Sequence, residues 1–276
     1  MTKRKEKTNN NTGGENITKK EMTLLFIKFL EIKKKGWIKS QRKGSTGIGY
    51  TFERLIGKQE ENLPIADFYN IEIKVKKKFS KGDITLFSAN PDNEVFAIKR
   101  IYDTYGTCNK NKNYFKTFAI NVSVNNYSRK GKYLFKLKVD YDNRVIKLQV
   151  FDLNKNLIEE NISWSFELIN EKIKYKIKNL SIIKAEVKKD IFENEYFYYY
   201  HIDFYEIIDD EEFIKQIENG IITILFNISV YMDAKKYGNI YNHGTSFRIK
   251  YLILKNYIIK KTLKKITDSR IQLFFI

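Results

Sequence analysis

The chain has 276 residues and a formal charge of +18 at pH 7, from 51 basic against 33 acidic residues. A hydrophobic fraction of 42% and an aromatic fraction of 15% exclude an intrinsically disordered protein. The single cysteine, Cys108, excludes an internal disulfide framework and fits a reducing compartment, so we expect a cytoplasmic protein. We also expect no membrane span, because no apolar run approaches roughly 18–20 residues.

The excess of positive charge indicates a polyanionic partner, and phosphate groups are the first candidate. A second explanation stays open, because an AT-rich genome also encodes a chain rich in Lys, Asn, Ile and Tyr. An anionic membrane is disfavoured as the partner, since no expected helix combines a basic face with a bulky apolar face.

The first part of the chain predicts a tail, a helix, a loop and a second helix. Residues 1–18 have almost no apolar groups and are predicted to be a disordered basic tail. Apolar residues at helical spacing predict a helix over residues 19–35. A loop rich in Gly, Ser and Lys follows over 40–49, and then a short helix over 50–57 that carries Glu53.

The rest of the chain mixes strands with helices, which predicts an α+β (mixed α/β) fold with a central mixed sheet flanked by helices. A strand over 67–74 is expected to pair with a second strand over 83–88. The C-terminal extension, residues 251–276, has no assigned role and is predicted to contain a helix over 252–266. The remaining expected elements are helices over 92–105, 163–179 and 209–219, and strands over 115–122, 133–139, 145–151, 181–187, 194–207 and 221–231, with a loop over 238–248 that leads into a last strand.

The strand Asp67-Phe-Tyr-Asn-Ile-Glu-Ile-Lys74 is apolar, yet polar groups interrupt it. Successive side chains of a strand alternate, so Glu72 and Lys74 share one face, and Asp67 can reach that side from the preceding turn. Two converging carboxylates repel unless a cation balances them. Mg²⁺ takes such oxygen ligands, and Lys74 can then activate a water or neutralise phosphate charge. The alternative is an ordinary exposed Glu–Lys pair.

Longer motifs surround this strand, in five segments: G-W-I-K-S-Q-R-K-G-S-T-G-I-G-Y-T-F-E over 36–53, D-F-Y-N-I-E-I-K over 67–74, T-L-F over 85–87, W-S-F-E over 164–167 and H-G-T-S-F-R over 243–248. Over roughly residues 30–250 the chain resembles the MvaI/BcnI-type restriction endonucleases, relatives of the mismatch-repair nickase MutH among the PD-(D/E)XK nucleases. The resemblance implies a PD-(D/E)XK nuclease core with an additional β-rich DNA-recognition lobe, the two together spanning residues 19–250.

The resemblance also implies a set of catalytic residues. Asp67, Glu72 and the backbone carbonyl of Ile73 would hold Mg²⁺, and Lys74 would position or activate the attacking water. In the family a glutamate at the position of Glu53 joins the site. Without the resemblance, Glu53 is interpreted as a surface residue of its helix.

Two segments are expected to contact double-stranded DNA. The glycines of the 40–49 loop let the backbone approach a phosphate closely, although the P-loop pattern is absent. The residues predicted to bind DNA in and beside this loop are Lys39, Arg42, Lys43, Ser45 and Thr46. The second segment covers residues 238–248. In the family this segment faces the bases, so the resemblance implies DNA contacts from His243, Thr245, Ser246 and Arg248, with Asp233 a weaker candidate.

The chemistry of the second segment leaves an alternative open. Arginine is the usual bidentate reader of guanine in the major groove, which favours Arg248 as a base contact. Arg248 as a phosphate clamp and His243 as a loop-packing residue is the other interpretation. His201, in an aromatic strand, is interpreted as a packing residue, and the lysines of 76–78 line a DNA cleft or face solvent.

The resemblance implies a type II restriction endonuclease that cuts double-stranded DNA at a short specific site with Mg²⁺ and leaves 5′-phosphates. It also implies a monomer that nicks one strand, reorients and nicks the other, and a cognate DNA methyltransferase that is encoded separately. A MutH-like nickase of mismatch repair is one alternative, although the long motif and the T-L-F segment look closer to the restriction enzymes. A DNA-binding protein without nuclease activity is disfavoured, because Asp67, Glu72 and Lys74 are all present.

Overall fold

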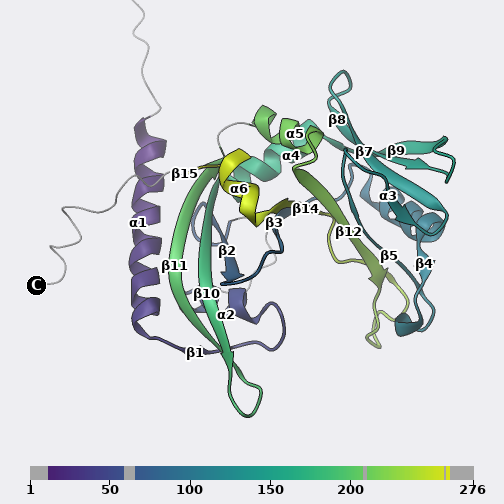
Figure 1. Cartoon of the computed structure of the whole chain (residues 1–276). Coiled ribbons are helices and arrows are strands. Elements are labelled where there is room, and N and C mark those ends of the chain that lie inside the picture. The colour runs from purple at the N-terminus through teal and green to yellow at the C-terminus, as the bar shows by residue number, and fades with distance from the viewer. Residues whose placement is uncertain (1–11, 59–65, 208–209, 258, 262–276) are drawn as a thin grey trace, which may run out of the picture. The chain divides into compact units, whose positions relative to one another are not determined.

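The computed structural model describes residues 12–58, 66–207, 210–257 and 259–261. The chain divides into two compact units, which are drawn together in Figure 1. Unit 1 contains Met1–Ser80, Lys178–Glu206 and Lys261–Ile276, and unit 2 contains Lys81–Ile177 and Ile207–Lys260. Within the described ranges, no helix is long and apolar enough to cross a membrane.

Unit 1 is built on a mixed sheet. Its main path follows the order β1 (Ile38–Lys39), β11 (Glu195–Ile207), β10 (Asn179–Lys189) and β2 (Ile71–Lys77); the last strand of the described chain is β15 (Ile259–Lys261). β10 runs antiparallel to β11 and parallel to β2, with Glu72 opposite Leu180 and Lys74 opposite Ile182. β2 is therefore the last strand of the main path, and its edge that does not pair with β10 can accept contacts from other groups.

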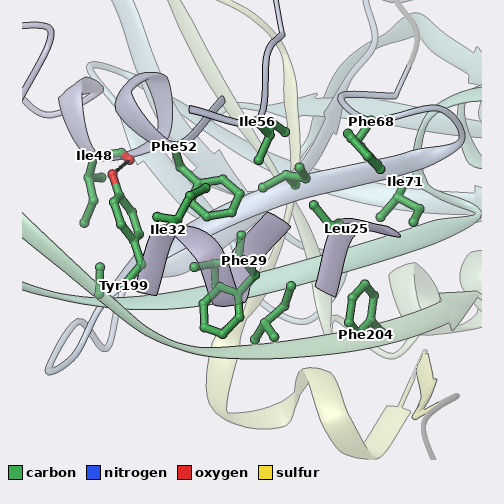
Figure 2. Close-up of a cluster of buried hydrophobic side chains, with 14 of the residues drawn as sticks. Leu25, Phe29, Ile32, Ile48, Phe52, Ile56, Phe68, Ile71, Tyr199 and Phe204 are labelled. Atoms are coloured by element: carbon green, nitrogen blue, oxygen red, sulfur yellow. Dashed lines mark hydrogen bonds between the residues drawn. The ribbon is translucent and has the colours of Figure 1, made fainter. Parts of the chain in front are cut away.

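Two helices, α1 (Thr12–Lys34) and α2 (Gly47–Leu55), cover one face of this sheet (Figure 2). Side chains alternate along β2, so Ile71 and Ile73 enter this core while Glu72 and Lys74 point to the other face. Full burial of one such large apolar side chain is worth about 1.5–3 kcal/mol. The residues of this core that Figure 2 labels are Leu25, Phe29, Ile32, Ile48, Phe52, Ile56, Phe68, Ile71, Tyr199 and Phe204.

Unit 2 contains two sheets (Figure 1). The first follows the order β3 (Asp83–Ser88), β14 (Ser246–Lys250), β12 (Ile222–Val230), β5 (Lys116–Val122) and β4 (Thr107–Cys108), with β13 (Ile240–Asn242) paired to β12. The second is the meander β6 (Ser128–Lys130), β7 (Tyr133–Asp140), β8 (Val145–Phe151) and β9 (Leu157–Ser165). The helical segments are α3 (Glu94–Arg100), η1 (Ile101–Tyr105), η2 (Lys110–Lys112), α4 (Phe166–Lys172), η3 (Ile173–Ile177), α5 (Asp210–Glu218) and α6 (Tyr251–Tyr257).

Aromatic side chains fill the core of unit 2. Trp164 on β9 is fully buried, and its indole Nε1 donates a hydrogen bond to the backbone oxygen of Ala89, 3.0 Å away. Its ring packs against Phe226 of β12 and Phe247 of β14. The tryptophan of the W-S-F-E motif thus ties β9 to the first sheet of the unit.

The mixed α+β class was predicted correctly, but the predicted partner of the first strand was wrong. β3 pairs antiparallel with β14 in unit 2, whereas β2 pairs with β10 in unit 1. An apolar pattern defines a strand without specifying its partner, and the parallel partner of β2 lies about a hundred residues later in the chain.

Several predicted boundaries also differ from the structure. α1 begins at Thr12, so residues 12–18 are helical where a tail was expected, and residues 1–11 lie outside the described ranges. The helix predicted from residue 163 begins at Phe166, because the Oγ of Ser165 caps it by accepting a hydrogen bond from the Leu168 amide. The C-terminal helix covers Tyr251–Tyr257 and is followed by β15, and residues 262–276 are outside the described part.

Candidate active site

The loop before α2 is folded by contacts with its own backbone. Ser40 donates a hydrogen bond from Oγ to the backbone oxygen of Arg42 (2.6 Å), and the Gln41 amide donates one to Oγ1 of Thr51 on α2 (3.0 Å). A Cβ atom at Gly47 would lie 2.4 Å from the Arg42 oxygen, so this close approach requires glycine. These contacts fix where α2 starts.

Buried Tyr199 of β11 fixes α2 from the other side. Its hydroxyl donates a hydrogen bond to the Ile48 oxygen (2.8 Å), and its ring packs against Phe52 at 5.1 Å between centroids. Burial, and then the negative charge of Glu53, raise the pKa of Tyr199, so the hydroxyl keeps its proton. The helix that carries Glu53 is therefore held firmly on the sheet.

Asp67 lies just before β2 and is bound at both carboxylate oxygens. Oδ2 accepts a hydrogen bond from the Ile73 amide at 2.8 Å, on the edge of β2 that does not face β10. Oδ1 forms an ion pair with Nζ of Lys58. A carboxylate six residues before Ile73 thus returns to the strand, as the sequence predicted for the turn.

Glu72 and Lys74 project from β2 itself. Glu72 is 2% exposed, and its Oε1 forms an ion pair with Nζ of Lys74, whose side chain is a quarter exposed. A buried carboxylate is stable only when it is paired, so this contact stabilises the charged form of Glu72. The predicted shared face of the two residues agrees with this contact.

These groups line one cavity of about 370 Å³ in unit 1. Its polar residues include all four predicted catalytic side chains, Glu53, Asp67, Glu72 and Lys74, together with Lys58. The cavity is an open depression beside α2 and the edge of β2. Three carboxylates and two ammonium groups therefore converge where the sequence predicted two or three acids and one lysine.

Electrostatic coupling supports this convergence. Burial, and then the negative charge of Asp67, raise the pKa of Glu53, while Lys58, Lys74 and Arg42 act in the opposite direction. The pKa of Lys58 is raised: burial opposes the charged form, but the hydrogen bond and negative charge of Asp67 outweigh it. Glu53 is thus close enough to interact electrostatically with Asp67, Lys58 and Lys74. A glutamate on the exposed surface of its helix would not be expected to do so.

The donor chemistry of this cavity fits a hard divalent cation. No cluster of three or more His, Cys, Asp or Glu with metal-binding geometry occurs in the described residues. The predicted ligand set, however, needs only two carboxylates, Asp67 and Glu72, plus the backbone carbonyl of Ile73. Mg²⁺ is commonly held by one or two carboxylates and keeps several waters, so two acids beside an open cavity suit it.

The residues of the loop that were predicted to bind DNA divide into two groups. Arg42, Ser45 and Thr46 line the cavity, and the Arg42 guanidinium lies 3.7 Å from the centre of the Tyr50 ring. Lys39 and Lys43 are exposed and are not among the lining residues. Only the first group stands beside the catalytic side chains.

The second predicted segment belongs to unit 2. Side chains alternate along it, so Thr245 is fully buried with Phe247, whereas Ser246 and Arg248 take the other face of β14. A direct contact of Thr245 with DNA does not agree with this burial; its Oγ1 lies 3.4 Å from the Asn242 side-chain nitrogen. Ser246 has its Oγ 3.2 Å from the Oγ of Ser88.

His243 and Arg248 differ in how the protein holds them. The His243 ring is 4.1 Å from the Tyr241 ring, and its Nε2 is 3.3 Å from the Ser229 Oγ. Partial burial of the ring, and then the charge of Lys112, lower the pKa of His243. Among the described groups, the buried Nε of Arg248 has no hydrogen-bond partner. Asp233 is exposed and accepts a hydrogen bond from the Lys236 amide in a turn.

Two features of the cavities were not predicted from the sequence. Lys58 lines the cavity that contains the predicted catalytic side chains, and its only local signal in the sequence was a lysine that follows Gly57 at the end of a helix. In unit 2, a second cavity of about 470 Å³ is lined by Asn90, Asn242 and His243 among others, and the Asn242 amide donates a hydrogen bond to Asn90 (2.7 Å). Nothing in the spacing of residues 90 and 242 predicts this pair.

A mixed sheet with one acid and a lysine on its edge strand, a second acid just before that strand and a third on a flanking helix fits an α+β nuclease of the PD-(D/E)XK type. The model of the MvaI/BcnI restriction endonuclease family matches residues 26–257. The chain belongs to the MvaI/BcnI restriction endonuclease family and is a site-specific deoxyribonuclease, which confirms the predicted family and fold class.

Two solved structures support this assignment. A complex of restriction endonuclease MvaI with its cognate DNA substrate is 32% identical, covers 88% of this chain and 98% of its own, and superposes with a TM-score of 0.80. MvaI in the absence of DNA is 31% identical at the same coverage, with a TM-score of 0.56. None of the curated proteins matches the chain.

Proposed function

We propose that the chain is a type II restriction endonuclease that hydrolyses double-stranded DNA at a short specific site with Mg²⁺. The observation that carries this proposal is the convergence of Glu53, Asp67, Glu72 and Lys74 on one cavity of unit 1. The match to MvaI, whose solved complex contains cognate DNA, supports the choice of double-stranded DNA as substrate.

Each side chain has a role that its contacts allow. Asp67 is fixed by the Ile73 amide and Glu72 by its ion pair, so both carboxylates can hold Mg²⁺ together with the Ile73 carbonyl. Bound Mg²⁺ supplies Lewis acidity towards a phosphoryl oxygen and lowers the pKa of a bound water. Lys74 orients the attacking water or neutralises charge that develops on the phosphate.

Glu53 and Lys58 act from the helical side of the cavity. The raised pKa of Glu53 makes this carboxylate a better proton acceptor than an ordinary surface glutamate, so it can accept a proton from the attacking water directly or through a second water. The ammonium group of Lys58 pairs directly with Asp67 and holds this carboxylate in place. Arg42, Ser45 and Thr46 line the same cavity and are the proposed contacts to the DNA backbone.

Sequence recognition is assigned to unit 2. Arg248 and His243 are the proposed base contacts, with Ser246 beside Arg248 on the same face of the segment. Thr245 acts as support, because it is buried. We further propose a monomeric enzyme that works in the cytoplasm and whose host DNA is protected by a separately encoded methyltransferase.

Cleavage of methylation-free DNA by the purified protein tests the proposal. We expect discrete fragments with 5′-phosphate ends at one short sequence, in Mg²⁺ but not in EDTA, and sequencing of the ends gives the site. Nicking of only one strand at each site would favour a MutH-like enzyme, which the comparisons do not support. Binding without any cleavage would leave a DNA-binding protein and overturn the proposal.

A further inference from the structure

The face of the unit 1 sheet that carries Glu72 and Lys74 continues beyond the catalytic cavity. Lys76 is the next residue of β2 on this face, about 6.6 Å further along the strand. The parallel register puts Lys184 of β10 opposite Lys76, and the antiparallel register puts His201 of β11 opposite Lys184. Three basic side chains therefore form one row across three neighbouring strands, about 4.8 Å apart from strand to strand.

A buried carboxylate anchors this row. Asp203 is 3% exposed and lies on β11 opposite Ile182 of β10, which in turn lies opposite Lys74 of β2. Its Oδ1 is 3.1 Å from Nε2 of His201, and its Oδ2 is 3.9 Å from Nζ of Lys184. The first contact joins residues two apart on β11, and the second crosses from β10 to β11, so both basic side chains stand on the Asp203 face.

The basic side chains remain accessible above this carboxylate. The His201 side chain is 46% exposed and that of Lys184 is 26% exposed. Lys76 is partly exposed, and its Nζ donates a hydrogen bond to Ser80 (3.3 Å). His201 is therefore not a buried packing residue, which corrects its interpretation from the sequence.

We infer that Lys76, Lys184 and His201, anchored by Asp203, form a binding site for backbone phosphates of DNA beside the catalytic cavity. The inference rests on the proposed function, because it assigns the row to the DNA that the cavity would cleave. We call the three basic residues, Lys76, Lys184 and His201, the cationic row.

Three arguments support a phosphate as the ligand. The row continues from Lys74 along one strand face, so DNA bound at the cavity would extend over it in one direction. Lys184 and His201 are held by Asp203, which reduces the entropy that they lose when a phosphate binds. The two lysines of the row present only hydrogen-bond donors, and the neighbouring Glu186 and Glu195 are engaged by Lys78 and Lys77. A polyanion that carries many phosphates meets these conditions, and a neutral ligand does not.

The salt dependence of DNA binding tests the inference. Lys76→Gln and Lys184→Gln, singly and together, are compared with wild type on cognate and random DNA across a salt series, with Ca²⁺ in place of Mg²⁺. Each lost phosphate contact is expected to reduce the slope of log K against log [salt] by about one and to weaken both DNAs by the same factor. Lys184→Arg keeps the charge and is expected to keep the slope.

Lys189→Gln is the matched control. Lys189 lies on β10 as Lys184 does, but it pairs with Glu193 in the turn after the strand, away from the row. Its removal deletes one charge from the same strand and is expected to leave the slope unchanged. Thermal unfolding shows whether Lys184→Gln, which takes one partner from buried Asp203, is folded; Lys76→Gln changes a partly exposed side chain and tests the row independently.

The outcomes separate this inference from the proposed function. An unchanged slope in both Lys76→Gln and Lys184→Gln, or an equal decrease in Lys189→Gln, overturns the cationic row even if the wild type cleaves DNA normally. Absence of Mg²⁺-dependent cleavage by the wild type overturns the proposed function, and the slopes still report on the row because they are measured without cleavage.

Discussion

Glu72 and Lys74 stand two residues apart on β2, and their ion pair places the ammonium group in the catalytic cavity. We predict that Lys74→Ala lowers the cleavage rate at least about 100-fold, the order of loss when one electrostatic stabiliser is removed. DNA binding in Ca²⁺ should survive, because phosphate contacts come from other residues. The measurement is single-turnover cleavage in Mg²⁺ beside gel-shift affinity in Ca²⁺.

Lys77 provides the control for this prediction. It is the last residue of β2, but it stands on the other face of the strand and pairs with Glu195 at 3.8 Å. Lys77→Ala should therefore cleave at the wild-type rate. Near-normal cleavage by Lys74→Ala would remove Lys74 from the catalytic set.

Arg248 is the second residue whose role can be measured. A guanidinium that reads guanine should lose about 1–3 kcal/mol on the cognate site when replaced by alanine, and preference should relax at one position. A phosphate clamp would instead weaken cognate and random DNA alike and reduce the salt slope by about one. Affinities of Arg248→Ala for both DNAs across a salt series distinguish the two.

An exposed arginine of the same unit serves as the reference. Arg129 donates a hydrogen bond from Nε to the Gly131 oxygen at 3.2 Å, far along the chain from the segment that reads bases. Arg129→Ala should leave the ratio of cognate to random affinity unchanged. If Arg248→Ala also leaves that ratio unchanged, Arg248 does not belong to the specificity set.

The sequence predicted the convergence of the proposed catalytic residues better than the exposure of the proposed base contacts. Asp67, Glu72 and Lys74 follow from local rules, since one turn and the alternation of one strand bring them together. The same alternation would have excluded Thr245, because Thr245, Phe247 and Ile249 share the buried face of one segment. Lys58 and the Asn90–Asn242 pair depend on tertiary contacts, which no local spacing encodes.

Most strands and helices could be predicted from the sequence, but the elements with which they pair could not. Alternating apolar residues correctly located β5, β7, β8 and β12. The pairing of β2 with β10 joins residues more than a hundred positions apart, and β3 belongs to another sheet. Hydrophobic periodicity states which face of an element is buried, but it does not state against which element that face packs.

The packing of α2 gives a prediction about stability. Phe52 is fully buried against Tyr199, one residue before Glu53. Phe52→Ala should lower the free energy of unfolding by about 3–5 kcal/mol, because it removes apolar contacts and leaves a cavity. Urea unfolding at 25 °C measures this loss.

Phe79→Ala is the matched substitution on the surface of the same unit. Phe79 is 86% exposed, so its replacement by alanine should change the free energy of unfolding by no more than about 0.5 kcal/mol. Equal losses in the two variants would mean that the core between α2 and the sheet does not stabilise the unit as described.

For the whole molecule, the charge of +18 makes binding to DNA strongly dependent on salt. Much of this charge does not belong to a defined site. Lys99, Lys147 and Lys189 each pair with a carboxylate outside the proposed sites. Composition therefore indicated a polyanion, whereas the catalytic cavity and the cationic row identify which basic residues are expected to set the affinity.

The last prediction concerns assembly. The proposed catalytic set of one chain comes wholly from unit 1, and its four side chains need no second copy to complete the cavity. One cavity cuts one strand at a time, so a monomer should produce a nicked intermediate before the double-strand break. Sedimentation velocity with cognate DNA should give one chain per site, and quenched time points on supercoiled plasmid should show open circles that precede linear DNA. A stable complex of two chains on one site, with linear DNA formed without open circles, would contradict the monomeric mechanism.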